Sequence, residues 1–401
     1  MNCFQSIAAT LLLLSLQLPA QEGLRFLEKR IAEDPDDFVA QTQYGSRCLD
    51  ELRDTGRMEW LARAEAAKRA AFKGITLEQN PSGVLLEGKI ALASHRFADA
   101  LATARLYREL QPEKPAGLRL LFDAQFETGE YDAAAATLGL LEKAQPHSVD
   151  VASRWMRLAS IHGRVDDAVR AADECIAVAK ALTPSQPQML AWCLVQRGEF
   201  AFRMGDFPTA DEHYTAALAV VPRGWSAQEH LAELRAAQER PDEALALLGE
   251  AITATDRPEL FQAAGDVAAT AGRADLAEQS YAQALARYVA GGTLYRHHLA
   301  GFYCDAKPDY PTAVALAKAD VAQRKSIAAF DALAWALYLN GELQDARAAA
   351  ERAIATGTLD SHILRHAGLI SISNGDLARG RELIQKSAAA NPRQQTFHFH
   401  R

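Results

Sequence analysis

A polar turn followed by an amphipathic helix is the pattern that recurs along this chain. In residues 128–134, 204–210, 271–277, 340–346 and 374–380, a turn glycine precedes a small residue by five positions. A glycine in such a turn ends the preceding helix in a left-handed cap. The small residue then lies in the opening turns of the next helix. The pattern predicts short helices joined in pairs, with no strands.

The small residues form a series with a nearly constant period. Neighbouring members lie 33 to 36 residues apart, except for one interval of 42. The members are Ala64, Ala100, Ala134, Ala168, Ala210, Ala244, Ala277, Ala313, Ala346 and Gly380. A second series lies twelve residues upstream in most repeats, at Gly88, Gly198, Ala232, Gly265, Gly301, Ala334 and Gly368. We predict that the two series face each other where paired helices approach most closely, because large side chains there would force the backbones apart.

Small residues at these positions, a proline that closes several repeats and a period near 34 residues together resemble the tetratricopeptide repeat. The resemblance extends over residues 38–394. It implies an all-α, right-handed solenoid of about ten helix–turn–helix repeats. Residues 333–392 are also similar to exported bacterial tetratricopeptide proteins of unassigned function, and that narrower resemblance implies no activity.

The repeats suggest a division of the chain. Residues 21–37 are expected to form a lead-in capping helix, residues 38–190 repeats 1–4, residues 191–394 repeats 5–10, and residues 395–401 a tail. Between the fourth and fifth repeats, Pro184 and Pro187 interrupt the helical pattern, and this segment is the candidate hinge.

The N-terminal residues do not follow the repeat pattern. Residues 7–16 form a short apolar run, and Pro19-Ala20 precedes a polar segment. This pattern is typical of a cleaved secretory signal over residues 1–20 and predicts a periplasmic or secreted protein. The alternative is a buried N-terminal helix. No other stretch has the length of a membrane-spanning helix.

Composition and the absence of known motifs narrow the classes of function that the protein can have. With 49% apolar and 23% charged residues, the chain can form a packed core. The net charge is −8 and no cluster of lysine and arginine stands out, so nucleic acid is not an expected partner. No phosphate-binding loop, nucleophile elbow or paired Cys-x-x-Cys occurs. We therefore predict no enzyme and no cofactor.

Cysteine and histidine are the remaining candidates for chemistry. Cys48, Cys175 and Cys304 fall at expected core positions, and only Cys175 and Cys193 could pair, so most thiols should be reduced. His362 and His366 have a metal-ligand spacing on a helix, which keeps a metal-dependent enzyme as a third hypothesis. The alternative places both histidines on a solvated surface, because no third ligand is assured.

The first helix of each repeat is expected to line a concave groove, which is the usual binding surface of such solenoids. Aligning the repeats places a basic stretch, then an acidic stretch with Glu229, Glu233, Glu259 and Asp266, then an aromatic stretch, on this inner face. The candidate partner-binding residues are Lys89, Arg119, Arg157, Trp192, Arg203, Tyr295, His298, Phe302, Trp335 and Tyr338.

Three hypotheses about function follow. The leading hypothesis is a protein-interaction scaffold whose arginines bind carboxylates of a partner segment. A glycan-binding solenoid of a polysaccharide export or surface assembly system is the alternative, marked by the aromatic stretch. A metal-dependent enzyme centred on His362 and His366 is the third hypothesis. Against a binding groove stands the simpler interpretation that the charges only solvate the surface and the aromatic residues belong to the core.

Overall fold

A computed structural model describes residues 20–393, all of which form α-helices, one short 3₁₀ helix and the turns between them. The predicted signal peptide, apart from Ala20, and the predicted tail lie outside the described residues. The chain divides into two compact units, up to Leu121 and from Phe122 onward, and each is described here by itself. The predicted grouping into residues 38–190 and 191–394 stays a prediction.

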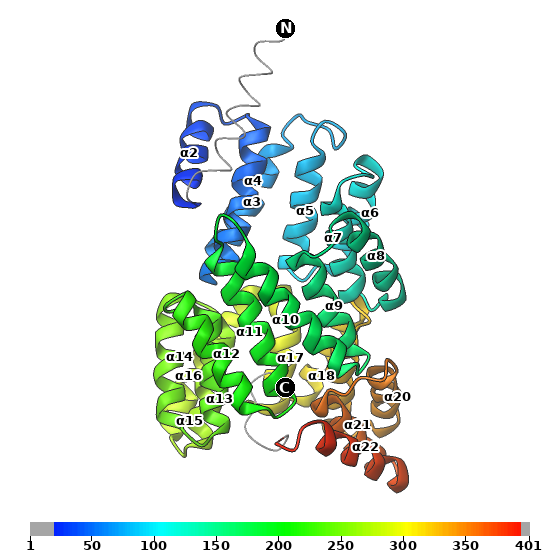
Figure 1. Ribbon diagram of the computed structural model, residues 1–401. Coiled ribbons are helices and arrows are strands. Elements are labelled where there is room, and N and C mark those ends of the chain that lie inside the picture. The colour runs from blue at the N-terminus through cyan, green and yellow to red at the C-terminus, as the bar shows by residue number, and fades with distance from the viewer. Residues whose placement is uncertain (1–19, 394–401) are drawn as a thin grey trace. The chain divides into compact units, whose positions relative to one another are not determined.

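Unit 1 begins with the expected lead-in helix, in which Leu24 and Leu27 are buried. Two hairpins and part of a third follow (Figure 1). The helices are α2 (Ala20–Glu33), α3 (Phe38–Thr55), α4 (Glu59–Ala71), α5 (Pro81–Ala93), α6 (Phe97–Leu110) and α7 (Pro115–Glu127), the last of which continues into unit 2.

Unit 2 continues the same alternation of first and second helices. Its elements are α8 (Tyr131–Ala144), α9 (Val149–Ile161), α10 (Val165–Ala181), α11 (Pro187–Arg203), α12 (Phe207–Val220), α13 (Trp225–Ala237), α14 (Pro241–Ala254), α15 (Pro258–Thr270), α16 (Ala274–Gly291), η1 (Gly292–Tyr295), α17 (Arg296–Asp305), α18 (Tyr310–Gln323), α19 (Ile327–Leu339), α20 (Leu343–Ile354), α21 (Ser361–Ser373) and α22 (Leu377–Ala390). Together with α3 to α7, these helices make the ten predicted hairpins. Within residues 20–393, none of the helices is long and apolar enough to cross a membrane.

The small residues lie where the pattern placed them. Every alanine of the main series is at most 5% exposed. In the last hairpin, a Cβ on Gly380 would lie 2.8 Å from the carbonyl oxygen of Gly368. The two residues therefore face each other across α21 and α22, and neither position has room for a side chain. The predicted contact between the two series is confirmed at this hairpin.

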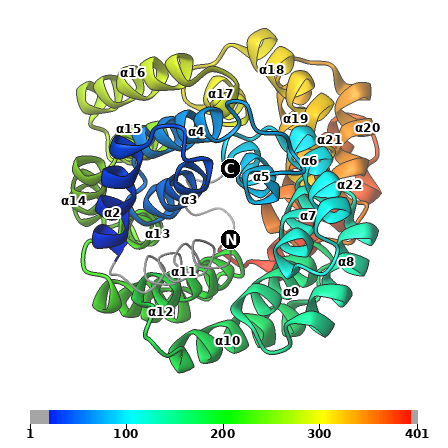
Figure 2. The ribbon, with the colours of Figure 1, turned by 90° about the horizontal axis from the view of Figure 1, so that it is seen from above.

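Unit 2 returns on itself, which the repeat pattern does not reveal. The amide of Lys325 donates to the carbonyl of Thr128 at 3.2 Å, and the amide of Ile327 donates to the Tyr131 hydroxyl at 2.9 Å. One repeat later, His162 Nδ1 donates to the carbonyl of Thr356 at 3.1 Å. The turns of early hairpins thus contact the loops between late hairpins (Figure 2).

The turn glycines are part of this closure. Gly163 has a φ of +65°, and a Cβ at this position would lie 2.6 Å from the Gly357 carbonyl oxygen. A Cβ on Gly129, whose φ is +78°, would collide with the carbonyl of Lys325. These glycines therefore serve two purposes: they cap a helix, and they let a distant loop approach the backbone.

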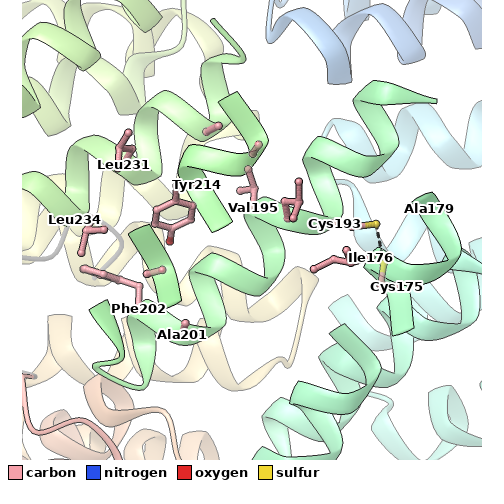
Figure 3. Packing of buried hydrophobic residues seen from close by; sticks show 14 of the residues in the cluster. Cys175, Ile176, Ala179, Cys193, Val195, Ala201, Phe202, Tyr214, Leu231 and Leu234 are labelled. Carbon is pink, nitrogen blue, oxygen red and sulfur yellow. Dashed lines mark hydrogen bonds between the residues drawn. The ribbon is translucent and has the colours of Figure 1, made fainter. Parts of the chain in front are cut away.

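The core of unit 2 includes a cluster around α11 and α12 (Figure 3). Tyr214 is fully buried there, and Gly198 leaves space for its ring. Cys175 and Cys193 also belong to this cluster, and their Sγ atoms lie 2.8 Å apart without a bond. The close approach that the sequence suggested is present.

All four cysteines of the described chain are buried and unbridged. Burial raises the pKa of the Cys48 thiol to about 11 and that of Cys304 to about 12. The thiolate is the reactive form of cysteine, so both thiols are expected to be inert in the folded protein. The redox state of the Cys175–Cys193 pair in solution stays a prediction.

Candidate functional site

A cavity of about 270 Å³ lies inside unit 2. It is lined almost wholly by the first helices of six consecutive hairpins, α11, α13, α15, α17, α19 and α21. This arrangement confirms, for these repeats, that the first helix of each hairpin faces inward.

The charge of this cavity is strongly negative. Arg203 is the one arginine in its lining, and no lysine takes part. Six carboxylates line it: Glu229, Glu259, Asp266, Asp305, Asp331 and Asp360. The other polar residues of the lining are Gln262, Tyr288 and four histidines, His297, His298, His362 and His366. The electrostatics favour a cationic occupant over an anionic one.

Two glutamates on neighbouring inner helices stand out. Glu229 on α13 is 7% exposed, and no hydrogen bond or ion pair within residues 20–393 reaches its carboxylate. Glu259 on α15 accepts from Arg257 at 3.2 Å through Oε1, whereas its buried Oε2 has no hydrogen-bond partner in the described chain. Buried carboxylate oxygens are ordinarily hydrogen-bonded, so the Glu229 carboxylate and the Glu259 Oε2 atom are exceptions.

Glu259 is held in its ionised form. Burial by itself would raise its pKa, but the charges of Arg257 and His298, together with hydrogen bonds from a backbone amide and from Arg257, outweigh burial and lower the pKa below its ordinary value. The His298 Nε2 atom lies 3.9 Å from Glu259 Oε1. The cavity therefore holds a fixed negative charge with one unsatisfied oxygen.

The opposite side of the cavity is built from α19 and α21. His366 is buried and its Nδ1 lies 3.1 Å from Asp331. Its ring stacks on Trp335 with centroids 4.0 Å apart and an angle of 9°. Trp335 in turn donates from Nε1 to Asp305 at 3.3 Å, which fixes the indole as part of the wall.

The interpretation of His362 and His366 as solvated surface residues is therefore wrong for His366. The two rings lie edge to face, 4.2 Å apart, and both line the cavity. Within the described part of the chain, no set of three or more His, Cys, Asp or Glu residues is arranged to hold a metal ion. The metal-dependent hypothesis therefore gains no support from this pair.

The predicted arginines do not offer an unpaired basic surface. Arg157 is bound by Asp123 at 3.3 Å and by Glu127 at 2.6 Å, and its guanidinium lies over the ring of Phe126. Arg203 is bound by Glu199 at 2.6 Å and lies 3.8 Å from Asp360. Carboxylates of the chain itself already pair with Arg157 and Arg203, and the binding of a partner's carboxylates by the predicted arginines stays a prediction.

The aromatic residues divide into two groups. Phe302 is 0% exposed and Tyr295 is 5% exposed, and both pack in a cluster with Tyr288. Their assignment to the groove surface is therefore wrong, since they belong to the core. Trp335 and Tyr338 are half-buried and stack on each other.

The remaining candidates lie in different places. His298 lines the cavity as predicted, whereas Trp192 packs against the core cluster of α11 and α12. Lys89 on α5 and Arg119 on α7 belong to unit 1. Of the ten predicted binding residues, Arg203, His298 and Trp335 are thus brought together in this cavity.

The hairpins and their spacing identify the family once the chain is compared with known proteins. A family model for the tetratricopeptide repeat matches residues 85–149, 195–258 and 332–395. The chain is a tetratricopeptide repeat protein. Stacked repeats of this kind present an extended surface for other proteins, and this tetratricopeptide repeat protein is accordingly a protein-interaction scaffold.

Solved structures with a similar chain path include a human IFIT1 dimer with m7Gppp-AAAA. It shares 14% identity over 92% of this chain and 86% of that chain, with a TM-score of 0.49. The APC/C hetero-tetramer Cut9–Hcn1 shares 16% identity over 98% of this chain and 67% of that chain, with a TM-score of 0.41. At these values the likeness carries no argument about the ligand of this tetratricopeptide repeat protein. No curated protein matches the chain in sequence.

Proposed function

We propose that this tetratricopeptide repeat scaffold binds a segment of a partner protein on the inner surface of unit 2. The observation that supports the proposal most strongly is the cavity, which six consecutive first helices line. Ligand pockets commonly measure roughly 300–1,000 Å³, so a cavity of about 270 Å³ suits one or two side chains. A segment that crosses the inner surface would place such side chains in it.

Trp335 is the residue most suited to anchor the segment. It lines the cavity, remains half-buried and is held in place by His366 and Asp305. A rigid, partly exposed aromatic ring gives much contact area at low entropic cost. The glycan alternative needed a stripe of exposed aromatic residues, and burial of Tyr295 and Phe302 removes half of that stripe.

We further propose that the scaffold acts in the periplasm or outside the cell. The support is the apolar run of residues 7–16 followed by Pro19-Ala20. N-terminal sequencing of the natively expressed protein is expected to begin near Gln21. Recovery of the chain from the cytosol with Met1 intact would contradict export.

Site-specific photo-crosslinking in the native cell tests the proposed surface. A photoreactive residue in place of Ala328, which is exposed and lines the cavity, should trap a partner protein. The same residue in place of Leu140, which is 52% exposed on α8 and does not line the cavity, is the control. Equal trapping at both positions, or none at Ala328, would contradict binding in the cavity.

Trp335→Ala then separates binding from folding. We expect the trapped partner to bind with an affinity reduced by about 2 kcal/mol or more, because hot-spot aromatic residues reach that magnitude. The melting temperature should change by only a few degrees, since the ring is partly exposed. If Trp335 is mainly a core residue, stability will instead fall by about 3–5 kcal/mol and binding by the folded fraction will be unchanged.

A further inference from the structure

We propose that the cavity of unit 2 is a cation subsite that receives the guanidinium or ammonium group of an arginine or lysine side chain, with the Glu229 carboxylate as its direct ligand. This inference rests on the proposed function, since the side chain belongs to the bound segment. It also reverses the charge of the partner that the sequence suggested. The sequence pointed to a carboxylate-bearing segment, whereas the cavity calls for a basic one.

The lack of a hydrogen bond or close ion pair at the Glu229 carboxylate is the first argument. Only 7% of this residue is exposed, and it lines the cavity without a hydrogen bond or close ion pair to the rest of the described chain; the charge of Arg257, which also pairs with Glu259, acts on it from a longer distance. A buried carboxylate without a partner destabilises a fold, so such a residue is usually paired or functional. A cation that enters the cavity would supply the missing partner.

The neighbouring Glu259 provides a second acceptor. Its Oε1 is bound by Arg257, but its Oε2 has no hydrogen-bond partner in the described residues. The opposing charges of Arg257 and His298 lower the pKa of Glu259, so the carboxylate stays ionised near neutral pH. A guanidinium has several donors in a fixed plane and can therefore bridge two carboxylates.

The protein's own cations offset only part of the negative charge of the cavity. Arg203 is bound by Glu199 at 2.6 Å and lies 3.8 Å from Asp360, so it offsets one carboxylate of the lining. Arg257 is held between Glu259 and the ring of Trp225, with its guanidinium 4.9 Å from that ring's centroid, and its charge is shared between Glu259 and Glu229. With six carboxylates in its lining, the cavity still keeps an excess of negative charge that a cationic ligand would offset.

An organic cation fits the cavity better than a metal ion. No group of three or more metal-binding side chains is suitably arranged anywhere in residues 20–393. The lining also includes the apolar surfaces of Trp335 and Ile363, which suit the aliphatic stem of a lysine or arginine. A metal ion is bound by nitrogen, oxygen or sulfur ligands and gains nothing from apolar surfaces.

Binding of short capped peptides to the full-length protein tests the subsite. Acetyl-Ala-Arg-Ala-amide is compared with acetyl-Ala-citrulline-Ala-amide, in which a neutral urea of the same shape replaces the guanidinium. By titration calorimetry, we expect the arginine peptide to bind at least tenfold more tightly. Equal affinity of the two peptides would overturn the cation subsite.

Glu229→Gln is the decisive variant because it removes the charge and keeps the shape. It should abolish the preference for arginine over citrulline. Glu142→Gln, which changes an exposed glutamate on α8, is the matched control and should retain that preference. An unchanged preference in Glu229→Gln would overturn the role of Glu229.

Thermal unfolding without any ligand gives an independent readout. Glu229→Gln should raise the melting temperature, because it removes a buried charge that has no hydrogen bond and shares Arg257 with Glu259, whereas Glu142→Gln should leave it unchanged. A lower melting temperature for Glu229→Gln would show that the carboxylate stabilises the fold and would overturn its assignment as a ligand-binding group.

Putrescine distinguishes a free amine from a partner's side chain. We expect it to bind more weakly than the arginine peptide, because the residues beside the arginine can also contact Trp335 and Ile363. Tighter binding of putrescine would overturn the assignment to a partner side chain. The two proposals can fail separately. If a partner is trapped at Ala328 but the arginine and citrulline peptides bind equally, only this inference is overturned. If no partner is trapped at Ala328, the proposed function is contradicted.

Discussion

Replacement of Phe302 by alanine should lower the free energy of unfolding by about 3–5 kcal/mol, the usual cost of truncating a buried phenylalanine. Phe302 is 0% exposed, and its ring meets those of Tyr281 and Tyr288 edge to face with centroids 5.9 Å apart in both cases. Its removal would leave a cavity between α16 and α17 that these rings cannot fill without losing their contacts. The loss should appear as a lower midpoint in urea unfolding.

Phe302→Leu is the control for this measurement. Leucine keeps most of the apolar volume, so this variant should lose roughly 1–1.5 kcal/mol. Partner binding by the folded fraction should be unchanged in both variants, because the side chain does not reach the inner surface. A Phe302→Ala variant that keeps its stability but loses binding would restore the original interpretation of Phe302 as a groove residue.

Replacement of Gly129 by alanine should destabilise unit 2 more than the same change at Gly272. Both glycines have a left-handed backbone, with φ of +78° and +73°, so both variants incur about 1–2 kcal/mol for that conformation. A Cβ on Gly272 meets no atom within 4 Å, whereas a Cβ on Gly129 collides with the Lys325 carbonyl. Gly129→Ala should therefore cost about 1–3 kcal/mol more, the range for overpacking.

The comparison isolates the contact that closes unit 2, since the helix-capping role is common to both glycines. Urea unfolding of the two variants under identical conditions gives the difference directly. Equal destabilisation would mean that the Thr128 turn and the Lys325 loop do not touch in solution.

The hairpins could be predicted from sequence because local rules determine them. A turn glycine ends a helix, and a small residue marks where two helices touch, as Gly368 and Gly380 show. Neither rule needs knowledge of distant residues. The number of repeats, the lead-in helix and the inward orientation of the first helices followed from the same period.

The closure of unit 2 could not be predicted in this way. It joins residues about two hundred positions apart, such as Tyr131 and Ile327. Whether they meet depends on the rotation from each hairpin to the next, accumulated over six hairpins. Small differences in packing at each step decide the result, and the period of the sequence does not record them.

The candidate site was partly visible in the sequence. Aligning the repeats placed Glu229, Glu259 and Asp266 on the inner face, and all three line the cavity. Asp331 was missed, although it lies one helical turn before Trp335 and therefore on the same face of α19. Tyr295 and Phe302 were wrongly assigned to the inner face. Repeat alignment gives the helix face on which a residue lies, but it does not show that Tyr288 of the preceding second helix packs against both side chains and buries them in the core.

Closure of unit 2 around the acidic cavity is the central claim, and an engineered disulfide tests it most directly. The Lys325 amide donates to the Thr128 carbonyl at 3.2 Å, so cysteines at positions 128 and 325 should be close enough to bond. Under mild oxidation, mass spectrometry of the folded Thr128→Cys, Lys325→Cys protein should show nearly complete cross-linking. The control, Ala271→Cys with Lys325→Cys, places a cysteine at the equivalent turn position of a hairpin without such a contact and should stay reduced. A 128–325 pair that stays reduced as well would contradict the closed arrangement and the cavity that depends on it.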